Sequence, residues 1–174
     1  FIYIICIKFI NKVIFCSLNK MHNTVQNLIK IEKDIGSNLN DLNINNQTKI
    51  IAVSKTFGVD KILPLIHYGH SDFGENKVQE AVDKWTELKK ENPSLKLHMI
   101  GKLQTNKVKY AVKLFDFIHS VDSEKLARKI SEEDKKINKK TKVFIQVNIG
   151  GEEQKSGVSK TDLHKLILYC KEVS

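Results

Sequence analysis

The stretch Ile50-Ile51-Ala52-Val53-Ser54-Lys55-Thr56 decides the fold class, because it is a short apolar run that ends in a lysine and a turn. Four similar runs follow, beginning at residues 71, 96, 117 and 142, so that successive starts lie 21 or 25 residues apart. Near-continuous apolar runs are typical of strands that are covered on both faces, which are parallel strands. The spacing therefore predicts a repeating unit built around parallel strands.

Each interval between these runs carries apolar residues at helical spacing, and residues 22–42 do so before the first run. The pattern predicts one helix followed by five βα units. Crossovers this uniform make a doubly wound sheet or a (β/α)8 barrel. No glycine-rich phosphate loop follows the first strand, which disfavours the dinucleotide-binding sheet. We therefore expect an α/β fold of the (β/α)8 TIM-barrel type, incomplete, with about five units after an N-terminal helix.

The two ends of the chain set the expected domain boundaries. Fourteen of the first eighteen residues are apolar, but Lys8 and Lys12 interrupt them, and the first methionine is Met21. We expect residues 1–20 to be an apolar leader translated upstream of a start at Met21, with a membrane anchor as the alternative. Residues 21–174 are expected to form a partial barrel truncated at its C-terminus, since three more units would need about 70 further residues.

Composition restricts the possible partners and the compartment. The net charge is +9, from 29 basic and 20 acidic residues, but Arg128 is the single arginine. Arginine supplies the planar fork that grips phosphates and base edges, so an excess of lysine is a poor sign of nucleic-acid binding. Cys6, Cys16 and Cys170 form neither a metal-binding spacing nor an even disulfide framework. A reducing cytoplasm, with no nucleic-acid or membrane partner, fits this composition best.

Ligand sites in such folds lie at the C-terminal ends of the strands, and four residues there are candidates. Because strand side chains alternate, Val53 and Lys55 share a face, and a poorly hydrated lysine is an amine that condenses with aldehydes. A lysine at this place is, taken alone, more often one whose tip extends into solvent. Asn76 follows the second strand and either contacts a ligand or, like Glu75, caps the next helix.

Further features of the strand ends are less specific. Ile100 precedes Gly101 at the end of the third strand, and Thr105 or Asn106 is expected to cap the helix that follows. Gly150-Gly151 opens a charged loop after the fifth strand that is either functional or a surface turn. The histidines have no metal-binding spacing and are expected to be core or surface residues, and no catalytic triad can be assembled. These histidines are His98, His119 and His164.

Four blocks in order resemble the pyridoxal phosphate homeostasis protein family. They are Ile51-Ala52-Val53-Ser54-Lys55-Thr56, Phe73-Gly74-Glu75-Asn76-Lys77-Val78-Gln79-Glu80, His98-Met99-Ile100-Gly101-Lys102-Leu103-Gln104-Thr105-Asn106-Lys107 and the segment 147–157, VNIGGEEQKSG. The resemblance extends from about Met21 to the end. It implies a barrel like the N-terminal domain of alanine racemase that binds pyridoxal 5'-phosphate as a Schiff base on Lys55, with Asn76 near the cofactor ring. Val53 and Ile100 are expected to line the same pocket.

The resemblance also implies a function in intracellular cofactor homeostasis without established catalysis. The cofactor would be held, buffered and handed to pyridoxal-phosphate-dependent apoenzymes in the cytoplasm. The family's phosphate-binding loops are expected beyond Ser174. Three alternatives stay open: an enzyme of the amino-acid racemase type, a non-functional fragment of the carrier, and a lysine-rich module for RNA or acidic lipid.

Overall fold

The computed structural model describes residues 21–41, 48–150, 152 and 156–173. The leader expected at residues 1–20 lies outside the described residues. The chain divides into two compact units. The first contains the helices α1 (Asn23–Asp41) and α2 (Val59–Tyr68), which contact each other. Gly69 ends α2, with a φ of 103° that favours glycine and its N–H bonded to the carbonyl of Ile66.

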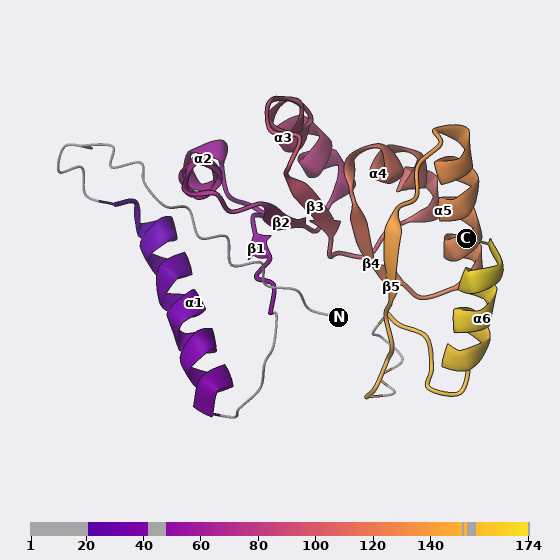
Figure 1. The fold of residues 1–174 in the computed structure, drawn as a ribbon. Helices are drawn as coiled ribbons and strands as arrows, with labels where there is room; N and C mark the ends of the chain where they lie inside the picture. The colour runs from indigo at the N-terminus through magenta and orange to yellow at the C-terminus, as the bar shows by residue number, and fades with distance from the viewer. Residues whose placement is uncertain (1–20, 42–47, 151, 153–155, 174) are drawn as a thin grey trace. The chain divides into compact units, whose positions relative to one another are not determined.

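The second unit contains a parallel sheet of five strands in sequential order (Figure 1). The strands are β1 (Ala52–Val53), β2 (Asp72–Glu75), β3 (Lys96–Met99), β4 (Phe117–Val121) and β5 (Lys142–Ile145). Each strand pairs in parallel with the next, and the register shifts between Ile118 and Val121 where β4 meets β5. Sequential parallel order is the arrangement of a (β/α)8 barrel, so the predicted fold class is confirmed, with five of its strands described.

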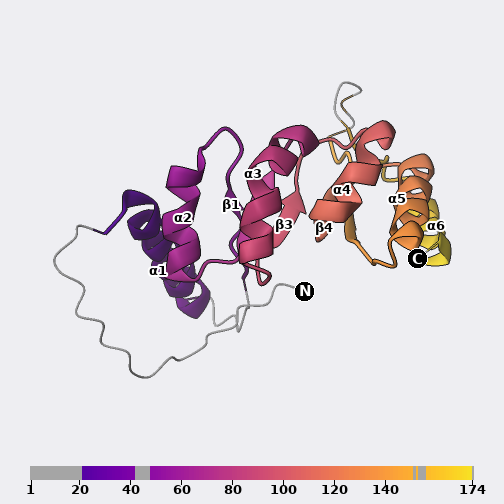
Figure 2. The same ribbon diagram turned by 90° about the horizontal axis from the view of Figure 1, so that it is seen from above.

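Helices of the second unit follow their strands along one side of the sheet (Figure 2). They are α3 (Val78–Glu91), the 3-10 turn η1 (Thr105–Lys107) with α4 (Val108–Leu114), α5 (Glu124–Lys136) and α6 (Leu163–Val173). The core lies between these helices and the sheet, where Trp85, Phe73, Leu97, Ile118 and Phe115 are fully buried. The ring centroids of Phe73 and Trp85 lie 4.9 Å apart, which joins β2 to α3. We call the side of the sheet that these helices cover the helical face, and the opposite side the inner face.

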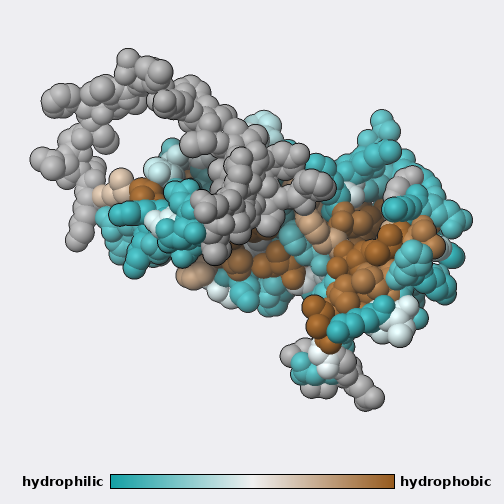
Figure 3. Space-filling view, turned by 60° about the horizontal axis from the view of Figure 1, so that its bottom comes forward, coloured by the Kyte–Doolittle hydropathy of each residue, from teal (hydrophilic) through white to brown (hydrophobic). Residues whose placement is uncertain are grey.

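Two strands are shorter than the apolar runs predicted. β1 ends at Val53 because Thr56 adopts a left-handed φ of 67° and turns the chain. β5 ends at Ile145 because Val147 forms a bridge with Val158 instead of extending the β4 pairing. On the inner face, the side chains of Val53 in β1 and Phe144 in β5 are exposed. Exposed apolar side chains form patches on the side of the molecule that faces the viewer in Figure 3.

Candidate functional site at the strand ends

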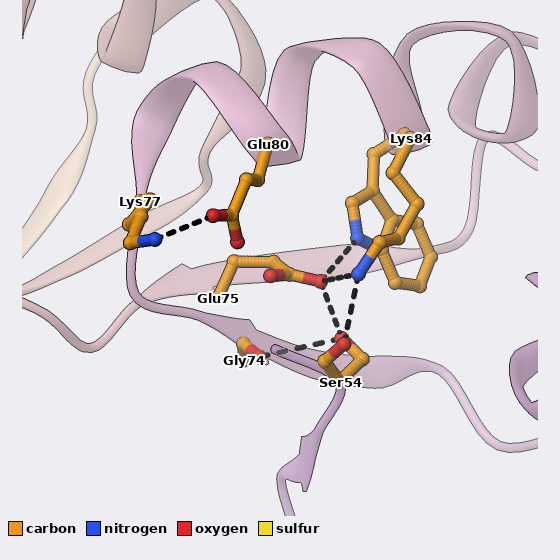
Figure 4. Close-up of polar contacts among 7 residues, drawn as sticks. Ser54, Gly74, Glu75, Lys77, Glu80 and Lys84 are labelled. Carbon is orange, nitrogen blue, oxygen red and sulfur yellow. Dashed lines mark hydrogen bonds and ion pairs between the residues drawn. The ribbon is translucent and has the colours of Figure 1, made fainter. Parts of the chain in front are cut away.

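Every polar group of Ser54, the residue before Lys55, is hydrogen-bonded (Figure 4). Its N–H donates to the carbonyl of Gly74 at 2.9 Å, and its Oγ donates to Glu75 Oε1 at 2.8 Å. Its carbonyl accepts from Lys84 Nζ, also at 2.8 Å. The peptide that carries Lys55 is therefore attached both to β2 and to α3.

Glu75 is the centre of this attachment, and its side chain is fully buried. Besides the Ser54 hydroxyl, Oε1 accepts from Lys84 Nζ and from Trp85 Nε1, each at 2.9 Å. Hydrogen bonds to a charged group contribute roughly 1.5–3 kcal/mol each. Lys84 and Trp85 lie nine and ten residues after Glu75 in the sequence, and they reach its carboxylate because α3 returns along the sheet. The expectation that Glu75 or Asn76 caps α3 is wrong, since Lys77 is the N-cap residue.

Lys55 lies on the inner side of the strand end, because Ser54 before it points to the helical face. Its side chain is exposed, and Val53 on the same face is 46% exposed. The expectation of a poorly hydrated lysine is therefore wrong for the described residues. The physical reason is that the sheet is open, so that no strand in the described part of the chain covers this face. The amine is accessible to a small molecule.

Asn76 follows β2 at the same end of the sheet, and its Oδ1 is buried without a hydrogen-bond partner among the described residues. A buried carbonyl oxygen of this kind costs free energy unless a donor reaches it. Next to it, Gly101 allows a close backbone approach: a Cβ on Gly101 would lie 2.2 Å from the main-chain oxygen of Asn76. The glycine after β3 thus lets Asn76 take its position.

Gly74 creates room between the strand ends. A Cβ on Gly74 would lie 3.2 Å from side-chain atoms of both Ile51 and Ile100. Ile100 also lines a cavity of about 450 Å³ with Lys102, Gln146 and Ile149. Lys55, Asn76 and Val53 do not line this cavity. The structure thus places Ile100 beside Gly74 and at this cavity, which the other three predicted residues do not line.

These residues fit a small aldehyde that carries hydrogen-bond donors. Lys55 offers an accessible primary amine, and Asn76 Oδ1 offers a buried acceptor that lacks a donor. Pyridoxal 5'-phosphate belongs to this chemical class, so the residues present are compatible with it. Within the described ranges, no group of three His, Cys, Asp or Glu residues could hold a metal ion.

The other predicted strand-end features have mixed outcomes. Gly150 is exposed after β5, while Gly151 and residues 153–155 lie outside the described residues. Gln104, and neither Thr105 nor Asn106, is the N-cap residue of η1, so that prediction is wrong. His98 is buried, which agrees with a core residue, and His119 is half-buried.

Sequence reasoning missed the hydrogen-bonded set around Ser54. A signal was present, since an acidic residue ends a buried strand and a lysine follows nine residues later on the next helix. That spacing alone does not show that the lysine turns inward. Only the return of α3 along β2 brings Lys84 and Trp85 onto the same carboxylate oxygen.

The sequential order of the parallel strands places the described sheet in the (β/α)8 barrel class. A family model described as the alanine racemase N-terminal domain matches residues 33–174. The chain belongs to this family. No helix in the described ranges is long and apolar enough to cross a membrane.

The curated relatives it matches include pyridoxal phosphate homeostasis proteins, which confirms the resemblance seen in the sequence. The protein of Vibrio cholerae is 41% identical over 123 residues, covering 70% of this chain and 52% of the relative. That of Aquifex aeolicus is also 41% identical, over 74% of this chain and 55% of the relative. The chain thus spans about half the length of these relatives.

Solved structures give the same fold. PipY of Synechococcus elongatus PCC7942 with PLP bound is 30% identical with a TM-score of 0.74, covering 87% of this chain and 66% of that one. Alanine racemase of Clostridium difficile 630 is 19% identical with a TM-score of 0.63, covering 84% and 36%. This second likeness concerns the fold alone.

Proposed function

We propose that this chain binds pyridoxal 5'-phosphate through Lys55 and serves the homeostasis of this cofactor in the cytoplasm. The observation that carries the proposal is the position of Lys55. It follows β1 at the inner side of the sheet, on a peptide held by Gly74, Glu75 and Lys84. The names of the curated relatives and the PipY structure with PLP bound support the choice of ligand.

The four predicted residues receive separate roles in this proposal. Lys55 supplies the amine, and the cofactor, when bound, supplies the aldehyde with which an amine condenses. Asn76 offers its buried Oδ1 to a donor on the ligand. Val53 and Ile100 provide apolar surface on the inner face at the same end of the sheet as the amine. The held Ser54 peptide reduces the conformational freedom that binding would otherwise have to remove.

We further propose that the chain has no catalytic activity of its own and passes the cofactor to apoenzymes. A racemase needs a second acid or base that acts on the opposite side of a bound amino acid. The relatives that support the proposal are named for homeostasis, whereas the likeness to alanine racemase concerns the fold alone. An amino-acid racemase is the second candidate.

Borohydride trapping tests the proposal directly. The chain is incubated with pyridoxal 5'-phosphate, reduced, digested and analysed by mass spectrometry. We expect the added mass on the peptide that contains Lys55, and its loss in Lys55→Ala. The matched control is Lys109→Ala, which removes an exposed lysine from α4 and leaves labelling of Lys55 unchanged.

Two results would overturn this function. Labelling spread evenly over exposed lysines, with no preference for Lys55, would contradict a specific site. Racemisation of alanine that requires the added cofactor and Lys55 would contradict the absence of catalysis and favour the racemase. Both measurements use the same protein preparation, so that they can be compared directly.

A further inference from the structure

Three side chains on neighbouring strands form a continuous hydrogen-bonded chain on the inner face. Asp72 Oδ1 on β2 lies 3.0 Å from His98 Nε2 on β3. His98 Nδ1 in turn lies 3.0 Å from His119 Nε2 on β4. The Asp72 and His98 side chains are 3% and 4% exposed. Neither the predicted site nor the Ser54 attachment uses these residues.

The chemistry of the three groups determines which atom donates and which accepts in each of these hydrogen bonds. An ionised carboxylate only accepts, so His98 Nε2 carries the proton that reaches Asp72. A neutral His98 then has its lone pair on Nδ1, and His119 must donate to it from Nε2. The lone pair of a neutral His119 is consequently on Nδ1. Among the described residues, the His119 ring forms its hydrogen bond through Nε2, which leaves Nδ1 without a partner there.

Aromatic contacts hold both imidazole rings in place. Phe117 stacks on His98 with ring centroids 4.4 Å apart and planes 2° from parallel. Phe144 stacks on His119 at the same centroid distance with planes at 29°. Burial is the largest cause that lowers the pKa of His119 and so favours its neutral form; a positive charge on His98 is the second cause and acts only when His98 is protonated. With His98 neutral, Nδ1 of the neutral His119 is the hydrogen-bond acceptor.

The register places His119 level with the strand-end site. His98 pairs with Phe117 and Met99 with Ile118, so the next residues along these strands are Ile100 and His119. His119 is half-buried, whereas the two groups behind it are buried. The series of hydrogen bonds from Asp72 through His98 to His119 therefore runs from buried side chains to an accessible one.

We propose that His119 is a ligand-binding residue of the inner face, whose Nδ1 accepts a hydrogen bond from an N–H or O–H group of the bound small molecule. Asp72 and His98 are positioning residues, since they act by holding His119 in its Nε2–H form. This inference rests on the proposed function for the identity of the ligand. The tautomer of His119 does not depend on that function and can be measured alone.

Nitrogen-15 NMR of the cofactor-free chain tests the positioning. We expect His119 to carry its proton on Nε2, with Nδ1 unprotonated. In Asp72→Asn, which removes the charge that orients His98, we expect this preference to weaken. His164, exposed on α6, serves as the reference in the same spectra. A proton on Nδ1 of His119, or an unchanged preference in Asp72→Asn, would overturn the positioning.

Pyridoxal 5'-phosphate is the probe for the ligand contact. On its addition we expect the Nδ1 resonance of His119 to move and that of His164 to stay. His119→Phe keeps a ring against Phe144 but lacks the acceptor, and we expect roughly 2- to 10-fold weaker binding, as for one hydrogen bond. The control His164→Phe should bind as the unchanged chain does.

The outcomes separate the two proposals. An unmoved Nδ1 resonance with normal trapping at Lys55 would overturn the contact to His119 and leave the proposed function standing. Absence of any cofactor binding by the unchanged chain would overturn the proposed function and the ligand contact together. The tautomer would still be read from the cofactor-free sample.

Discussion

The Ser54 hydroxyl donates a 2.8 Å hydrogen bond to Glu75 Oε1, which joins the residue before Lys55 to a buried carboxylate on the neighbouring strand. The same oxygen accepts from Lys84 and Trp85 of α3. Three contacts from two elements thus meet on one atom. The position of the Lys55 peptide is consequently sensitive to side chains that lie on the far side of the sheet from its amine.

Replacing the charge of Glu75 should therefore destabilise the chain. In Glu75→Gln the neutral amide weakens the contacts to Ser54, Lys84 and Trp85, and we expect a loss of about 2–3 kcal/mol in the free energy of unfolding by urea. Glu80→Gln breaks the exposed pair with Lys77 and should change it by less than about 1 kcal/mol. Equal effects of the two substitutions would contradict the central place of Glu75.

Gly101→Ala should disturb the position of Asn76. The new Cβ would meet the Asn76 carbonyl at 2.2 Å, a backbone atom that cannot rotate away. We expect a loss of about 1–3 kcal/mol, as for other overpacked sites, measured by urea unfolding. Gly36→Ala in α1 has nothing within 4 Å and should gain about 0.5–1 kcal/mol from helix propensity. A neutral Gly101→Ala would show that the close approach has no energetic weight.

Thr56→Gly should stabilise the chain. The left-handed φ of 67° costs a residue with a Cβ about 1–2 kcal/mol, while the freedom of glycine in the unfolded state offsets about 0.4–1 kcal/mol. We expect a net gain of about 0.5–1 kcal/mol in urea unfolding. Asn138, with a φ of 50°, tolerates this region better, so Asn138→Gly should give no gain. A loss of stability in Thr56→Gly would refute strain at this turn.

Glu133 should make the stability of the chain depend on acid pH. Hydrogen bonds from Lys129 and Lys136, each at 2.7 Å, lower its pKa from 4.5 to about 2. The unfolded chain therefore takes up this proton at a higher pH than the folded chain does. The contribution is complete above pH 4.5 and is lost as the pH falls through about 2.

Urea unfolding along this pH range measures the effect. Glu133→Gln should remove part of the acid-dependent loss of stability. Glu132→Gln is the control on the same helix, because Glu132 lies 3.9 Å from Lys129 and is half exposed. Identical pH profiles for Glu133→Gln and the unchanged chain would contradict the two ion pairs.

Much of the architecture could be predicted from the sequence, because period and order reflect local physics. The apolar runs predicted five parallel strands, and alternation placed Lys55 opposite the helical face. The hydration of Lys55 could not be predicted, since it depends on how much of the inner face is covered. The interactions of Glu75 and of the His98–His119 pair join distant segments, and neither periodicity nor spacing encodes such contacts.

β1 contains only two paired residues, and this shortness determines what limits the motion of the lysine that follows. The ladder hydrogen bonds of β1 alone give Lys55 little restraint, so the contacts of Ser54 with Gly74, Glu75 and the Lys84 ammonium hold the peptide that carries it. Deuterium uptake at the Lys55 amide should accordingly track the winding and fraying of α3. A change in α3 would thus reach the lysine from the opposite side of the sheet, through Lys84.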